Sequence, residues 1–119
     1  MKISTMRDLL EAEVLACGEK LGSHVYSAFA CDLMSDVLAF VDNQAVLLSG
    51  LVNPQVIRTA VMMDMNCIVF VRSKKPTQEM IDLATESGIV LLSTKKTMYT
   101  SSGILYANGL LGEQHEGKK

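Results

Sequence analysis

The stretch Cys67-Ile68-Val69-Phe70-Val71 decides the fold of this chain. It is continuously apolar, rich in branched side chains and bounded by polar residues, which is the pattern of a strand buried on both faces of a sheet. Two runs of the same kind lie at residues 45–49 and 89–93. These three runs predict three buried strands that lie side by side in one direction.

Helical segments separate the three runs. Asn53, followed by Pro54, predicts the start of a helix that extends to about residue 64, with Ile57, Ala60 and Val61 on its buried face. Thr77 predicts a helix that ends at Gly88 and buries Met80, Ile81 and Ala84. Thr97 or Thr94 opens a last helix that extends to about residue 108. Alternating strands and helices predict parallel pairing with right-handed crossovers.

The first 44 residues have a less regular pattern. They predict a helix at 5–12, strands at 14–17 and 24–29, and a helix at 33–41 that is capped by Asp32 and apolar on nearly every side. Together with the second half, they indicate an α/β fold, a three-layer α/β/α sandwich with a mostly parallel sheet of about five strands. We expect one domain over residues 1–111 and a disordered tail over 112–119.

Composition limits the classes of function. With 119 residues and a formal net charge of −2, the chain lacks the excess of Lys and Arg of a nucleic-acid-binding protein. The N-terminal residues lack the apolar run of a secretory signal, and no window predicts a membrane-spanning helix. The three cysteines are widely spaced and form no CxxC pair, which favours reduced thiols, a cytoplasmic location and no metal site.

A candidate site lies at the carboxyl ends of the predicted strands, where ligands bind in open parallel sheets. The residues there are polar or conformationally permissive, and the N-termini of the following helices and the loop lysines favour an anion. The candidate ligand-binding residues are Asp32, Ser35, Asp36, Ser49, Gly50, Asn53, Arg72, Ser93 and Thr94. Helix capping and ordinary solvated lysines explain many of the same residue types, so both interpretations stay open.

Motifs for catalysis are missing from the sequence. There is no GxxxxGK[ST] loop, no GxGxxG after a strand, and neither His24 nor His115 is placed as a base for a nucleophile. Asp32 and Asp36, four residues apart, could hold a hydrated Mg²⁺ or share a proton and serve a hydrolase or phosphotransferase, but such a pair is more often a helix cap and a solvated or interface carboxylate. We therefore expect a non-catalytic protein with no cofactor.

The chain resembles the stand-alone DRTGG-domain proteins over residues 2–110. The segments that carry the resemblance are Asp32-Leu33-Met34-Ser35-Asp36, the strand that ends at Ser49-Gly50, and the closing Leu91-Leu92-Ser93-Thr94. The resemblance implies a fold similar to the N-terminal domain of HPr kinase/phosphorylase, and a regulatory or assembly-forming role. The chain departs from the family at residues 72–74, Arg-Ser-Lys in place of a Thr-Gly-Gly-like stretch.

Two functions follow as hypotheses. The first is a ligand-sensing regulatory domain that binds a nucleotide or a phosphorylated metabolite and forms a homodimer. The second is an interaction module for a larger enzyme or a sensor kinase, such as a partner in a hydrogenase-related system. This module would bind its partner through the 33–41 helix and an exposed Met62.

Overall fold

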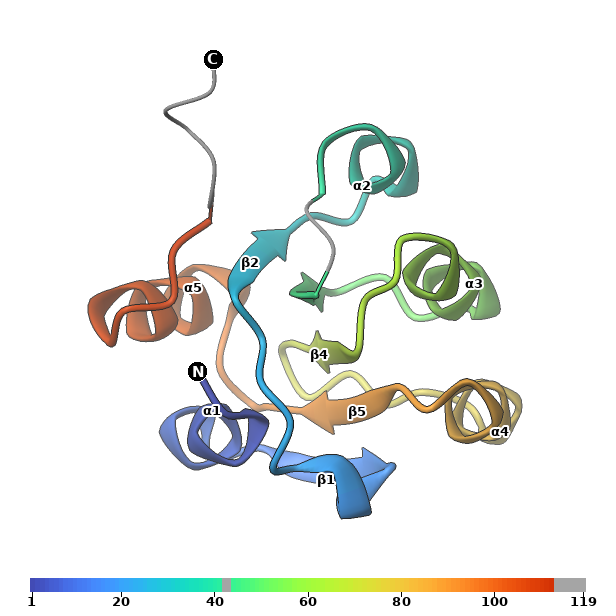
Figure 1. Ribbon diagram of the computed structural model, residues 1–119, viewed down its shortest axis with the longest axis horizontal. Helices are drawn as coiled ribbons and strands as arrows, with labels where there is room; N and C mark the ends of the chain where they lie inside the picture. Colours follow the sequence, from blue (N-terminus) through green and yellow to red (C-terminus); the bar gives the residue numbers. More distant parts are fainter. Residues whose placement is uncertain (42–43, 113–119) are drawn as a thin grey trace.

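The computed structural model describes residues 1–41 and 44–112 and confirms the α/β class (Figure 1). Most of the predicted tail, 113–119, lies outside the described residues. Five strands form one sheet in the order β1-β5-β4-β3-β2. In chain order, the elements are α1 (Ile3–Leu10), β1 (Glu13–Ala16), the 3₁₀ turn η1 (Gly18–Lys20), β2 (Ser27–Ala30), α2 (Met34–Phe40), β3 (Ala45–Ser49), α3 (Pro54–Met62), β4 (Cys67–Phe70), α4 (Gln78–Ser87), β5 (Val90–Ser93) and α5 (Met98–Ala107).

Strands β3, β4 and β5 form the centre of the sheet, as their apolar sequences predict. Every residue of the three strands is buried, and the three strands pair in parallel. Their registers place Ser49 beside Phe70, and Phe70 beside Ser93. The carboxyl ends of the central strands therefore converge on one edge of the sheet.

The two outer strands differ in direction. Strand β2 pairs with β3 in parallel, but β1 pairs with β5 in the antiparallel sense, with a register shift between Val14 and Ala16. Because β1 runs the opposite way, its first residue, Glu13, lies opposite Ser93 at the carboxyl end of β5. Residues from the start of the chain thus reach the edge where the candidate site was predicted.

Helices cover both faces of the sheet (Figure 1). Helices α2, α3 and α4 pack on one face, against a core that includes Leu47, Ile68 and Phe70. Helices α1 and α5 pack on the other face, against a core that includes Leu48 and Val69. The predicted three-layer sandwich is confirmed. Among residues 1–41 and 44–112, no helix has the length and apolar character needed to span a bilayer.

Three of the predicted helix caps are confirmed. The side chains of Asn53, Thr77 and Thr97 each accept a hydrogen bond from the backbone N–H three residues on, at the starts of α3, α4 and α5. Gly88 ends α4 in the left-handed conformation, with φ of 74°. These residues fix where each helix begins or ends because they satisfy backbone groups that the helix leaves free.

Three local predictions are wrong. Strand β2 begins three residues later than predicted, at Ser27, and His24 forms only an isolated bridge with Lys2. Asp32 does not cap α2: Leu33 stands at the N-cap, without a side-chain hydrogen bond. Val61 is 48% exposed, because the buried stripe of α3 is centred on Val56, Ile57 and Ala60.

Candidate functional site

The loops that follow β4 and β5 leave the sheet in opposite directions. The β4 loop leads to α4 on the α2–α4 face, and the β5 loop leads to α5 on the α1–α5 face (Figure 1). Two neighbouring parallel strands whose connections diverge in this way open a crevice at their carboxyl ends, which is where α/β proteins bind ligands. A crevice of about 220 Å³ lies at this point, lined by Glu11, Glu13, Ser73, Lys75, Ser93, Thr94 and Lys95.

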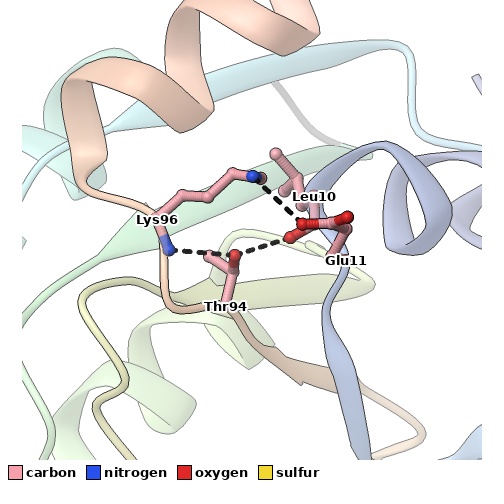
Figure 2. A network of polar contacts seen from close by, with 4 residues as sticks. All are labelled: Leu10, Glu11, Thr94 and Lys96. Atoms are coloured by element: carbon pink, nitrogen blue, oxygen red, sulfur yellow. Dashed lines mark hydrogen bonds and ion pairs between the residues drawn. The ribbon is translucent and has the colours of Figure 1, made fainter.

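The two predicted hydroxyl residues on β5 and its loop, Ser93 and Thr94, are buried beside this crevice. Ser93 Oγ donates to the carbonyl of Lys74 at 2.7 Å. Thr94 Oγ1 donates to the carbonyl of Leu10 at 2.7 Å and accepts the backbone N–H of Lys96 at 3.2 Å (Figure 2). Both hydroxyls hold neighbouring segments in place, so their first role is to fix the shape of the crevice.

Ion pairs line the side of the crevice that faces α1 and β1. Glu13 pairs with Lys75 from the β4 loop. Glu11 Oε1 lies 3.3 Å from Lys96 Nζ (Figure 2). Each carboxylate therefore offsets one lysine of the predicted basic loops, and the crevice carries both signs of charge.

A second group of predicted residues lies at the end of β3. Asp32 Oδ1 accepts the backbone N–H of Gly50 at 2.7 Å and lies 3.4 Å from Ser49 Oγ. A Cβ added to Gly50 would stand 3.2 Å from Arg72 Nη2 and 3.5 Å from Asp32 Oδ2. The absence of a side chain at Gly50 thus leaves room for both the Arg72 guanidinium and the Asp32 carboxylate, which form no ion pair with each other.

The loop after β4 has an unusual backbone. Arg72 and Ser73 both have positive φ, 56° and 61°, a conformation that costs energy in residues with a Cβ and that is often found at functional sites. The backbone N–H groups of Arg72 and Ser73 donate to the carbonyls of Lys96 and Thr94. Lys74 N–H donates to the Val71 carbonyl. Because these three N–H groups are engaged within the protein, they are not available to an anion.

Of the nine predicted residues, only Ser93 and Thr94 line the crevice. Three others belong neither to its lining nor to the group at the end of β3. Asn53 uses its side-chain oxygen to cap α3, accepting from the N–H of Val56 at 3.3 Å. Ser35 is exposed and Asp36 is half-buried in the first turn of α2. No three His, Cys, Asp or Glu residues come together as a metal site in the described part of the chain.

Two of the three cysteines, Cys17 and Cys67, offer no activated thiol. Burial raises the pKa of the Cys67 thiol. Burial, and after it the Glu19 carboxylate, raise the pKa of Cys17, while Lys20 acts in the opposite direction. Both side chains are therefore neutral thiols at physiological pH and poor nucleophiles.

Sequence reasoning missed Glu11 and Glu13. Both line the crevice, but the sequence pattern predicts no direction for the strand that begins beside them. Only the antiparallel direction of β1 brings its first residue to the carboxyl edge of β5. The one available signal was the presence of two carboxylates immediately before an apolar run.

Comparison with known proteins agrees with the fold. No protein-family model and no curated protein sequence matches the chain. Among solved structures, the CBS and DRTGG domains of the regulatory region of Clostridium perfringens pyrophosphatase, crystallised with its activator diadenosine tetraphosphate, are similar with a TM-score of 0.71. The sequence identity is 16%, and the match covers 87% of this chain and 45% of that one. This chain therefore has the fold of a part of that regulatory region.

Proposed function

We propose that this chain is a non-catalytic, ligand-sensing regulatory domain of the DRTGG type, related in fold to the N-terminal domain of HPr kinase/phosphorylase. Its ligand is a small anionic molecule, a nucleotide or a phosphorylated metabolite, bound along the carboxyl edge of the sheet. The observation that carries the proposal is the crevice where the β4 and β5 loops diverge. The regulatory role and the nucleotide activator of the pyrophosphatase region support it.

The exposed cations at this edge are the proposed ligand contacts. Arg72, Lys74 and Lys95 are exposed and make no ion pair with a described residue, unlike Lys75 and Lys96. The Arg72 guanidinium lies close to Gly50. The backbone N–H of Gly50 donates to the Asp32 carboxylate, and the N–H of Leu51 donates to Ser49 Oγ. We assign the phosphate to Arg72, because a guanidinium binds phosphate oxygens with two parallel hydrogen bonds. Ser93 and Thr94 shape the crevice beneath.

Replacing Arg72 tests this assignment. We expect a panel of nucleotides and sugar phosphates to raise the melting temperature of the wild-type chain. For the best ligand of the panel, Arg72→Ala is expected to weaken binding at least roughly tenfold, the effect of losing hydrogen bonds to a charged group. Isothermal titration calorimetry measures the affinities of both proteins. Arg58→Ala is the matched control, because Arg58 is exposed on α3 and outside the site.

Two results would contradict the proposal. If no member of the panel shifts the melting temperature or gives heat, the chain is not a sensor of such ligands. If Arg72→Ala and Arg58→Ala weaken binding equally, the phosphate is bound elsewhere.

A second proposed role is self-association through α2 and α3, which pack side by side. Both helices expose large apolar side chains, and these define the α2–α3 apolar surface: Leu33, Leu38, Phe40, Val61 and Met62. Phe40 and Met62 are each 69% exposed. Adjacent exposed apolar side chains on this scale are typical of protein–protein contacts.

Charge substitutions on the α2–α3 apolar surface test this role. We expect the wild-type chain to sediment as a dimer, and Phe40→Asp with Met62→Asp to sediment as a monomer with an unchanged circular dichroism spectrum, because a buried unpaired carboxylate opposes association. Tyr99→Asp, on the exposed side of α5, is the control and should remain dimeric. A monomeric wild-type chain at high concentration would refute self-association and leave the alternative of a larger enzyme or a sensor kinase as the partner of this surface.

A further inference from the structure

The carboxylates in the crevice bear on which anionic ligand the chain binds, and this inference rests on the proposed function. A site for a simple phosphate or a sugar phosphate would be expected to present cations and hydrogen-bond donors. Instead, Glu11 and Glu13 line the crevice together with Lys75 and Lys95. Two carboxylates in contact with a ligand can only accept hydrogen bonds, so the part of the ligand that enters here must donate them.

The two carboxylates are available to a ligand. Their partners hold them in exposed ion pairs: Glu13 is 57% exposed in its pair with Lys75, and Glu11 is 80% exposed in its pair with Lys96. Exposed pairs of this kind contribute little to stability because water screens both charges. A donor group can therefore replace or join a lysine at each carboxylate with little loss.

The volume of the crevice indicates that only one part of the ligand enters it. Its volume of about 220 Å³ is below the range of roughly 300–1,000 Å³ that is typical of sites enclosing a whole drug-sized ligand. It holds a planar base more readily than an entire nucleotide. The phosphate then lies outside it, toward Arg72, which precedes the crevice residue Ser73 in the chain.

We infer that the crevice selects nucleotides whose base carries an exocyclic amino group, with Glu11 and Glu13 as the acceptors for that group. Adenine and cytosine present such a donor, whereas hypoxanthine and uracil present a carbonyl oxygen at the same ring position. A carbonyl oxygen cannot form a hydrogen bond with a carboxylate, because both groups only accept hydrogen bonds. A base with a carbonyl at this position therefore binds less tightly. The crevice therefore discriminates by the hydrogen-bonding edge of the base, and the outer cations supply affinity for the phosphate without regard to the base.

Two matched pairs of nucleotides test the inference by calorimetry on the wild-type chain. We expect AMP to bind roughly tenfold more tightly than IMP, and CMP roughly tenfold more tightly than UMP, which is the effect of a hydrogen bond to a charged group. In the double variant Glu11→Gln, Glu13→Gln, the preference should disappear. Ribose 5-phosphate, which has no base, should bind the double variant at least as well as the wild type, because two negative charges have been removed.

Glu86→Gln is the matched control, since Glu86 is exposed near the C-terminal end of α4, which leads to the opposite edge of the sheet. It should keep the preference of the wild-type chain. Equal binding within both pairs, with ribose 5-phosphate also bound, would overturn the inference and leave the proposed function intact. Absence of binding by all five compounds would overturn both. A preference that survives in the double variant would show that other residues recognise the base and would also overturn the inference.

Discussion

Phe70→Ala is expected to lower the free energy of unfolding by about 3–5 kcal/mol, a large part of the stability of a domain of this size. Phe70 is fully buried at the end of β4, in the core beneath α2, α3 and α4. It is the last residue of its strand and pairs in register with Ser49 and Ser93. Removing its ring leaves a cavity in this core, at the strand position that pairs with Ser93 of the crevice. Urea denaturation followed by circular dichroism measures the loss.

Two companion variants separate packing from a general effect of aromatic substitution. Tyr99→Ala removes a ring that is 90% exposed and should change the free energy of unfolding by no more than about 0.5 kcal/mol. Phe70→Leu keeps most of the buried volume and should lose less than Phe70→Ala. If Phe70→Ala and Tyr99→Ala had the same free energy of unfolding, the burial of Phe70 in the core would be contradicted.

Thr94→Val is expected to lower the free energy of unfolding by about 1–3 kcal/mol, although it changes the volume of the side chain very little. The hydroxyl of Thr94 joins the loop after β5 to the end of α1, because it donates to the carbonyl of Leu10 and accepts the backbone N–H of Lys96 in its own loop (Figure 2). Valine fills the same space but leaves the Leu10 carbonyl and the Lys96 N–H without this partner in a buried position. The same urea denaturation measures the loss.

Thr100→Val is the control for this prediction, because Thr100 is exposed on α5 and its hydroxyl makes no hydrogen bond with a described residue. It should change the free energy of unfolding by about 0.5 kcal/mol or less. A Thr94→Val protein as stable as the wild type would show that the buried bridge contributes nothing net. It would also remove the reason for treating Thr94 as the residue that shapes the crevice.

The centre of the fold could be predicted because its sequence signals are local. The apolar runs at β3, β4 and β5 are buried on both faces, so every residue in them is selected for the same property. The caps Asn53, Thr77 and Thr97 act within one helical turn, and their residue types alone indicate the helix starts. Such features need no knowledge of distant segments.

The features that the sequence left open or predicted wrongly depend on distant segments. The direction of β1 is set by its pairing with β5 at the other end of the chain, and nothing within residues 13–16 specifies it. Asp32 was assigned to the helix that follows it, but its carboxylate accepts the backbone N–H of Gly50, just after β3. Val61 is at the margin of the buried stripe of α3, where the neighbouring helices decide how much of it is covered.

The candidate site was predicted in part for the same reason. The carboxyl edge follows from the parallel central strands, and Ser93 and Thr94 lie there beside the crevice. Asp32, Ser49, Gly50 and Arg72 form a second group at the end of β3. The two glutamates that balance the lysines lie at the start of a strand whose direction the sequence does not reveal, so their place at this edge was not predicted.

The pairing of β1 with β5 also has a consequence for how the chain is made. Within the sheet, Glu13 pairs with Ser93, which is synthesised about eighty residues later. Strand β1 therefore has no strand partner until nearly all of the domain has left the ribosome. Until then, the backbone groups of β1 are exposed, and contacts between residues so far apart in sequence form slowly. During synthesis, this outer strand is therefore the segment most in need of protection from pairing with another nascent chain.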